Sequence, residues 1–207
     1  MEDVLDLYAE PYDPKRPVVC FDEKPLQLLE ETRVPRPVAP GKAALVDYAY
    51  RRKGTANIFL AVQPLAGWRA VTVTGRRTRL DFAAEMKRLV DVHFPDAERI
   101  RVVLDNLNTH TPASLYDAFP PDEARRLARR LEFHYTPKHG SWLNMAEAEP
   151  SVLGGQCLDR RIGDRDILAQ EVAAWTARRN HERISIQWRF TVHDARRKLP
   201  HLYPSQP

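Results

Sequence analysis

Residues 100–110 have the sequence Ile100-Arg101-Val102-Val103-Leu104-Asp105-Asn106-Leu107-Asn108-Thr109-His110. The first part is apolar and rich in β-branched residues, is too short for a helix, and ends abruptly in polar residues. This pattern is typical of a strand that is buried on both faces of a sheet. Asp105 therefore stands where the strand ends, which is where ligands bind in α/β sheets. Asp105 and Asn106 also suit the opening of a plain turn, and this segment alone leaves that alternative open.

The composition indicates one globular domain. The chain has 207 residues, of which 29% are charged and 43% hydrophobic, so it can bury a proper core. No apolar run approaches the roughly 18 residues of a membrane helix, and the acidic N-terminus is no signal peptide. Two cysteines, Cys20 and Cys157, predict neither a disulfide framework nor a zinc site. We therefore expect a cytoplasmic protein without a membrane partner.

Basic residues are clustered although the formal net charge is only +4. Basic groups spread over many elements suit a surface that follows phosphate groups. The alternative is an ordinary solvated surface, and charge alone does not decide between them. The clusters are Arg51-Arg52-Lys53, Arg76-Arg77-Thr78-Arg79, Arg125-Arg126 with Arg129-Arg130, Arg160-Arg161, Arg178-Arg179 and Arg196-Arg197-Lys198.

Hydrophobic periodicity gives the order of elements. Residues 1–16 are expected to form a loose leader and residues 17–207 the main domain with C-terminal helices. A strand over 17–21 ends in Asp22, and a proline-rich loop follows over 30–42. Thr78 suits the N-cap of a helix that Pro95 ends. We further predict strands over 57–62, 68–74, 100–104 and 131–135, and helical segments over 112–119, 121–130, 142–158, 164–180 and 191–199.

This order predicts an α/β fold with a five-stranded mixed sheet, antiparallel at the start and parallel later, with helices on both faces. In a ribonuclease H-like arrangement the first strand lies beside the fourth, so Asp22 and Asp105 meet. A helix after the last strand then brings a third acid over them. Such an oxygen-only site suits Mg²⁺, which keeps waters and substrate phosphate among its ligands.

The candidate for the third acid is Glu147, in Ser141-Trp142-Leu143-Asn144-Met145-Ala146-Glu147-Ala148-Glu149-Pro150. Asn144 followed three residues later by Glu147 also matches a helix N-cap with its capping partner, so a purely structural role stays open. Glu149 is the neighbour most easily mistaken for Glu147. Three clustered acids repel one another, which proteins tolerate chiefly where cations neutralise them.

Several motifs in this order resemble the DDE transposases of bacterial insertion sequences related to the mariner superfamily. Each motif is weak alone, and together they extend over nearly the whole chain. They are Phe21-Asp22-Glu23-Lys24-Pro25, Gly54-Thr55-Ala56-Asn57-Ile58-Phe59, Leu104-Asp105-Asn106-Leu107-Asn108-Thr109-His110, Tyr135-Thr136-Pro137, Ser141-Trp142-Leu143-Asn144-Met145-Ala146-Glu147, Trp175 with Arg179-Asn180, Trp188-Arg189-Phe190-Thr191 and Asp194-Ala195-Arg196.

The resemblance implies a ribonuclease H-like fold and a catalytic, metal-binding triad of Asp22, Asp105 and Glu147. It implies two Mg²⁺ (or Mn²⁺) ions as cofactors, with metal-activated water cutting DNA at the transposon end and the freed 3′-hydroxyl attacking target DNA. Transposon ends, target DNA and a second copy in a homodimer are the implied partners, with the protein on the nucleoid when bound. Asn106 and His110 match positions beside the second acid, where they support the site or contact DNA.

Two departures from the family pattern lead us to expect a truncated copy with impaired activity. Relatives carry helix-turn-helix modules before the catalytic domain, whereas this chain starts almost at the first catalytic strand. Pro150 falls where an aromatic residue is expected, inside the helix that bears Glu147, and Gly154 and Gly155 follow. An interior proline costs about 3 kcal/mol and kinks a helix, and each glycine costs about 1 kcal/mol more.

Three other functions compete with this interpretation. Another ribonuclease H-like nuclease would use the same metal chemistry without joining DNA ends. A non-catalytic DNA-binding or dimerisation remnant of a transposase would show no dependence on magnesium. An aspartyl phosphatase needs a second Asp two residues after the first, and Lys24 stands there, so we discount it.

Overall fold

The computed structural model describes residues 1–33, 40 and 48–203. Its centre is one mixed sheet with the strand order β3-β2-β1-β4-β5. β1 pairs antiparallel with β2, and β2 with β3, whereas β1–β4 and β4–β5 are parallel. The predicted ribonuclease H-like order, with the first strand beside the fourth, is confirmed. The strands are β1 (Val18–Glu31), β2 (Tyr50–Gln63), β3 (Trp68–Thr74), β4 (Ile100–Leu104) and β5 (Leu131–Tyr135).

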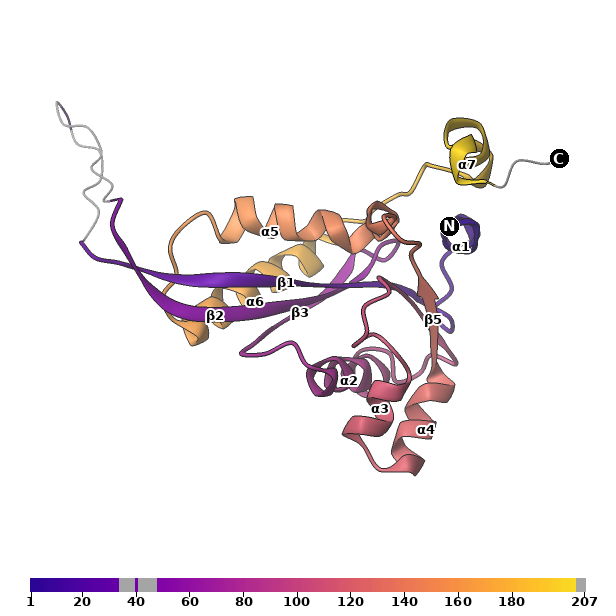
Figure 1. Ribbon diagram of the computed structural model, residues 1–207, viewed down its shortest axis with the longest axis horizontal. Coiled ribbons are helices and arrows are strands. Elements are labelled where there is room, and N and C mark those ends of the chain that lie inside the picture. Colours follow the sequence, from indigo (N-terminus) through magenta and orange to yellow (C-terminus); the bar gives the residue numbers. More distant parts are fainter. Residues whose placement is uncertain (34–39, 41–47, 204–207) are drawn as a thin grey trace.

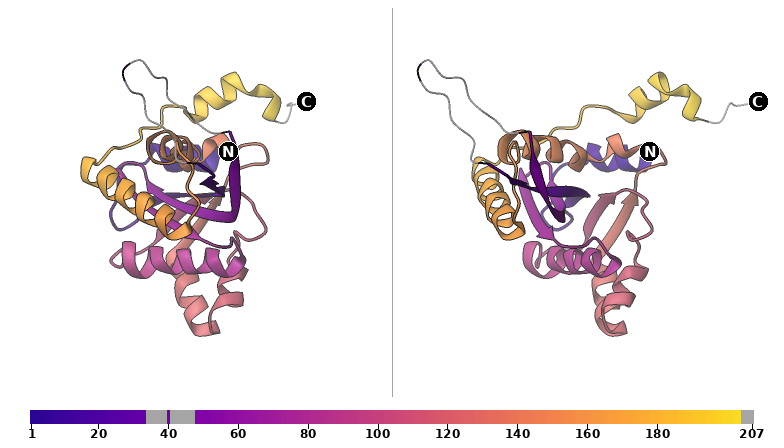
Figure 2. Two further views of the ribbon diagram at one scale, coloured as in Figure 1. Left: turned by 90° about the vertical axis from the view of Figure 1, so that its left-hand side faces the viewer. Right: turned by 60° about the vertical axis from the view of Figure 1, so that its left-hand side comes forward.

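Helices cover both faces of the sheet, as predicted. Figures 1 and 2 show α2, α3 and α4 on one side and α5 and α6 on the other, with α1 and α7 close together beyond the β5 end. The α-helices are α1 (Glu2–Ala9), α2 (Arg79–Arg88), α3 (Ala113–Ala118), α4 (Pro121–Arg130), α5 (Glu149–Cys157), α6 (Arg165–Glu182) and α7 (Val192–Lys198). A π-helical turn, η1 (Leu89–His93), continues α2, and the 3₁₀ turns are η2 (Ser141–Leu143), η3 (Met145–Ala148) and η4 (Pro200–Leu202).

Alternation along the strands divides the core into two sides. Val19 and Phe21 pack in one buried cluster with residues of α2, α3 and α4. Cys20, which lies between them, packs on the opposite side with residues of α1, η2 and η3. Because successive side chains of a strand point to opposite faces, Asp22 lies on the side of Cys20. That face is the one covered by η3.

The expected loose leader over residues 1–16 is wrong in its first half. Residues 2–9 form α1, in which Val4, Leu5 and Leu7 are buried against the sheet and α7. The Tyr8 hydroxyl donates to the backbone oxygen of Leu143 at 2.8 Å. Burial of this apolar face stabilises a helix too short to persist alone.

The first strand is also longer than predicted. It does not end at Asp22 but continues to Glu31, because its outer half pairs with β2 from Tyr50 onward. The two strands extend past the rest of the sheet in Figure 1. Most of the predicted proline-rich loop, residues 34–39 and 41–42, lies outside the described residues.

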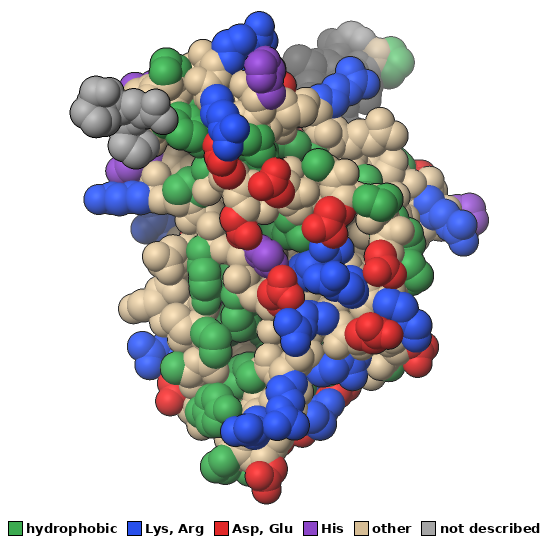
Figure 3. All heavy atoms as spheres, turned by 90° about the vertical axis from the view of Figure 1, so that its right-hand side faces the viewer, with side chains coloured by type: hydrophobic (Ala, Val, Ile, Leu, Met, Phe, Trp, Pro, Cys, Tyr) green, Lys and Arg blue, Asp and Glu red, His purple; other side chains and the backbone are tan. Residues whose placement is uncertain are grey.

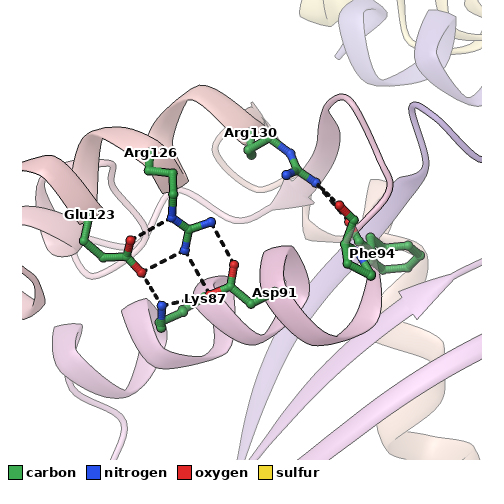
Figure 4. Close-up of polar contacts among 7 residues, drawn as sticks. Lys87, Asp91, Phe94, Glu123, Arg126 and Arg130 are labelled. Carbon is green, nitrogen blue, oxygen red and sulfur yellow. Dashed lines mark hydrogen bonds and ion pairs between the residues drawn. The ribbon is translucent and has the colours of Figure 1, made fainter.

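Ion pairs fasten α4 to the α2–η1 helix. Arg126 contacts Asp91 at 2.9 Å and Glu123 at 2.7 Å, and Lys87 contacts Asp91 at 2.8 Å and also pairs with Glu123 (Figure 4). Thr78 caps the start of α2 through a capping box, as predicted. Among the described residues, no helix is long and apolar enough to cross a membrane.

Candidate functional site

Asp22 and Asp105 lie on neighbouring parallel strands. The β1–β4 pairing runs from Val18 with Arg101 to Cys20 with Val103, so each acid lies two residues beyond the last pair. Beyond this point β1 pairs with β2 alone, and the sheet opens beside β4. The two carboxylates therefore stand at the edge of this opening. Asp105 lies near enough to Asp22 to raise its pKa, and Asp22 lies within its strand and not at its end.

The turn that carries Glu147 is held over the same face by a hydrogen bond from Asn144 to β1. Glu147 lies in η3, and the side-chain amide of Asn144 at the start of this turn donates to the Phe21 backbone oxygen at 2.8 Å. Asn144 also accepts the backbone N–H of Ala146 at 3.1 Å, so it does cap a turn. The capping role of Asn144 and the placement of Glu147 near Asp22 therefore occur together.

The expected distortion by Pro150 is absent. Glu147 precedes α5, which begins at Glu149, and Pro150 stands in its first turn. A proline there loses no helical hydrogen bond, because the first N–H groups of a helix have no partner inside it. This reason for expecting impaired activity is therefore removed.

Glu149 is not available to a metal ion in this structure. Its side chain is 2% exposed and binds Arg69 through two hydrogen bonds, of 2.8 and 2.7 Å. Arg179 of α6 approaches the same carboxylate at 3.5 Å. This buried network joins β3, α5 and α6, so Glu149 has a structural role and Glu147 is the free acid of the pair.

Electrostatic interactions show that the three predicted acids share one neighbourhood. Burial, followed by the Glu147 carboxylate, raises the pKa of Asp22 to about 7, and Glu23 and Asp105 act in the same direction. The backbone N–H of Glu23, which donates to Asp22 Oδ1 at 2.8 Å, opposes this shift. Such repulsion favours binding of a cation that neutralises the group.

His110 bridges two carboxylates below the site. Its Nδ1 lies 2.7 Å from Asp105 Oδ1 and its Nε2 lies 3.1 Å from Glu23 Oε2. Burial alone would lower the pKa of His110, but hydrogen bonds to Asp105 and Glu23 raise it to about 9. His110 is 1% exposed and therefore is not a DNA contact in this structure, whereas Asn106 is exposed beside Asp105.

The residues present fit a divalent ion in donor type. Carboxylate oxygens are the donors that Mg²⁺ prefers, and no Lys or Arg of the described residues forms an ion pair with Asp22 or Glu147. In the described part of the chain, no three His, Cys, Asp or Glu side chains are drawn together closely enough to hold an ion. Binding thus requires the carboxylates to turn toward one another, and Asp105 and Glu147 have the exposure to do so.

A cleft with a volume of about 450 Å³ opens beside Asp105. Its lining includes the exposed Lys138 and His139, from the segment between β5 and η2. A cationic side chain in the same cleft as Asp105 suits a substrate that carries a phosphate. The residues that line the cleft are Asp105, Asn106, Leu107, Thr136, Pro137, Lys138, His139 and Ser141.

Many of the clustered arginines serve the fold. Arg126 is part of the network of Figure 4, and Arg161 and Arg196 form ion pairs of 2.7 Å with acids of β1 and α1. On the face that carries β5, acidic and basic side chains are interspersed (Figure 3). The ordinary solvated surface is therefore the better description of these clusters.

Sequence reasoning missed Glu23 and the Arg69–Glu149–Arg179 network. Glu23 follows Asp22 directly and is only 4% exposed on its side chain, a burial that charged residues avoid unless they are paired. The alternation of β1 was the available signal, because it places Glu23 on the same face as Phe21, which α2, α3 and α4 cover. No local pattern indicates the partners of Arg69, which come from distant elements.

Comparisons with known proteins agree with this geometry. A family model described as DDE superfamily endonuclease matches residues 17–169. No match was found among curated proteins. The fold is similar to the crystal structure of the Mos1 mariner paired end complex with Mn, with 16% identity, a TM-score of 0.57 and coverage of 88% of this chain and 55% of that chain.

Two further Mos1 structures give the same result. The strand transfer complex has a TM-score of 0.56 and the paired end complex with Mg one of 0.55, each at 16% identity, covering 88% of this chain and 56% of that chain. The ribonuclease H-like fold is thereby confirmed. The chain spans about half the length of these Mos1 chains.

Proposed function

The chain belongs to the DDE superfamily endonuclease family, and on this basis we propose that it is a transposase catalytic domain that cleaves DNA and transfers strands with the help of divalent metal ions. One observation supports the proposal above all. Asp22 and Asp105 stand two residues beyond the same pair of parallel strands, and Glu147 is tied over them through Asn144. This grouping supports the proposal that the three acids form the family's metal-bound triad.

Asp22, Asp105 and Glu147 would hold the ions, for which we propose two Mg²⁺ or Mn²⁺. When bound, two such ions stabilise both the attacking and the leaving oxygen of an in-line phosphoryl displacement. The protein supplies a partly buried Asp22 whose charge is costly without a cation. It also supplies an open cleft, in which Asn106 and Lys138 are placed to contact the DNA backbone.

We propose DNA, both transposon ends and target, as the partner. Support comes from the Mos1 structures, which are paired-end and strand-transfer complexes of that protein. We propose a homodimer from the same Mos1 complexes. Joining the two transposon ends requires either two active sites or two ends that are bound at the same time. A protein with this role acts where the cell's DNA is, which supports a cytoplasmic, nucleoid-associated location.

A supercoiled plasmid that carries the element's ends tests this function. The unmodified protein is expected to nick it with Mg²⁺ or Mn²⁺ and not with EDTA, and Asp22→Asn and Asp105→Asn are expected to reduce nicking by more than a hundredfold. Asp117→Asn is the matched control, because Asp117 is a half-exposed surface acid that, among the described residues, pairs only with Arg79. Nicking that survives Asp22→Asn would refute the proposed site, and hydrolysis without end joining would point to another ribonuclease H-like nuclease.

A non-catalytic DNA-binding or dimerisation role is the second candidate. The observation that favours it is that, among the described residues, no three acidic side chains lie close enough together to hold an ion. In that case Asp22→Asn leaves DNA affinity unchanged or stronger, and no metal-dependent nicking is seen with the unmodified protein. Electrophoretic mobility shifts with and without Mn²⁺ distinguish the two functions.

A further inference from the structure

We propose that Glu23 and His110 act together as a positioning pair for Asp105, holding one of its carboxylate oxygens so that the other is presented to the metal site. This inference rests on the proposed function. The contacts that carry it are the 2.7 Å approach of His110 Nδ1 to Asp105 Oδ1 and the 3.1 Å approach of His110 Nε2 to Glu23 Oε2.

Asp105 needs such support because its backbone is outside the sheet. The β4–β5 pairing ends at Leu104 with Tyr135, and the Asp105 side chain is 38% exposed. A half-exposed carboxylate on a loop has several rotamers available, and only some of them point toward Asp22. A close contact with a fixed imidazole ring selects among these rotamers, as the outer-shell partners of metal ligands generally do.

His110 is itself fixed on every side. Its ring lies 4.8 Å from that of Phe82 and 5.9 Å from that of Phe21, measured between centroids. Its backbone oxygen accepts the Tyr135 hydroxyl at 2.7 Å, and its backbone N–H donates to Leu107 at 3.0 Å. These contacts therefore hold the imidazole ring in one orientation next to the loop that begins at Asp105.

Glu23 contacts the His110 ring through Nε2, whereas Asp105 contacts it through Nδ1. The Glu23 side chain is 4% exposed, and of the described residues only His110 and the half-exposed Arg77, at 3.9 Å, come within ion-pair distance. A buried carboxylate in this place fixes the orientation of the imidazole ring.

The decisive variant removes the pair while keeping the core packed. Glu23→Leu combined with His110→Phe replaces a buried ion pair by apolar side chains, an exchange that is often neutral for stability. We expect the double variant to fold and to bind Mn²⁺ with a dissociation constant about 10–100-fold higher, the usual effect of losing an outer-shell partner. Binding is measured by the electron paramagnetic resonance signal of free Mn²⁺ and folding by circular dichroism.

His134 offers a matched control. It too bridges two carboxylates, with Nδ1 2.8 Å from Asp3 and Nε2 3.1 Å from Glu132, but it lies on β5 and contacts none of the three acids of the site. His134→Phe is expected to leave Mn²⁺ affinity unchanged. If the double variant fails to fold, Glu23→Gln takes its place, with an expected loss of several-fold in Mn²⁺ affinity.

Unchanged Mn²⁺ affinity in a folded double variant, or in folded Glu23→Gln, overturns the inference and leaves the proposed function standing. An unmodified protein that binds no Mn²⁺ overturns both. An equal loss of affinity in His134→Phe also overturns the inference, because the effect would then not be specific to Asp105.

Discussion

Glu147→Gln and Glu149→Gln are two substitutions, two residues apart, with opposite expected effects. In Glu149→Gln an amide replaces a carboxylate that is 2% exposed and that accepts both hydrogen bonds from Arg69. The guanidinium of Arg69, which is 1% exposed, then stays buried without a counter-charge. Glu147 is exposed, and none of the described residues forms an ion pair with it.

The expected changes in the free energy of unfolding follow from the burial of each side chain. Removing one partner of a buried pair costs about 3–5 kcal/mol, a large share of the roughly 5–15 kcal/mol that stabilises a domain. For a chain of this length, that corresponds to a fall in Tm on the order of 10 °C. A substitution at the exposed Glu147 is expected to change the free energy of unfolding by less than about 0.5 kcal/mol.

Urea unfolding followed by circular dichroism and plasmid nicking are the two assays. We expect Glu149→Gln to be strongly destabilised and, where still folded, to retain metal-dependent nicking. We expect Glu147→Gln to be as stable as the unmodified protein and inactive. The opposite outcome, a stable but inactive Glu149→Gln beside an active Glu147→Gln, would refute the assignment of these two acids.

Three further substitutions test other parts of the structure. Gly154→Ala is expected to raise the free energy of unfolding by about 1 kcal/mol, because Gly154 lies inside α5 and an added Cβ meets nothing within 4 Å; an unchanged or lower Tm contradicts this. Tyr8→Phe leaves the Leu143 carbonyl without its 2.8 Å donor and should cost about 1–3 kcal/mol in urea unfolding; a cost below the error of the titration would show that α1 does not brace this segment. Arg126 and Lys87 hold the pKa of Glu123 at about 2, below its ordinary value of 4.5, so the stabilisation from its charge is present above pH 4.5 and is lost as the pH falls toward 2. The stability difference between the unmodified protein and Glu123→Gln should therefore shrink between pH 6 and pH 3, and a constant difference speaks against the network of Figure 4.

Local sequence patterns predicted most of the fold, because the residues that form each pattern also stabilise the element that the pattern predicts. The β-branched run before Asp105 forms β4, and the Thr78 capping signal begins α2 as expected. The strand β3 and the pair α3–α4 also lie close to their predicted bounds, whereas β2 begins at Tyr50, seven residues before its predicted start. In each case the information lies within a few neighbouring residues.

The errors concern features that distant contacts decide. The apolar face of α1 is too short to signal a helix before its partners are known, among them Leu143 and Ala195. The outer half of β1 is a strand because β2 pairs with it, not because of its own pattern. The effect of Pro150 depends on where α5 begins, which the sequence leaves ambiguous by the few residues that matter.

For the site, residue types and order located the three acids, but not the groups that surround them. Asp22 and Asp105 could be paired from the expected strand order, and the family resemblance assigned Glu147 as the third acid. The Glu23–His110 contact and the Arg69–Glu149 pair join residues 80 or more positions apart. Such pairings depend on the packing of the finished fold, and one sequence alone does not reveal them.

The central claim is that Asp22, Asp105 and Glu147 together bind divalent metal. A crystal of the protein soaked in Mn²⁺, with anomalous diffraction recorded at the manganese edge, tests it most directly. We predict manganese peaks in direct contact with carboxylate oxygens of all three residues. Peaks elsewhere on the protein, with Glu147 still turned toward solvent, would contradict the claim.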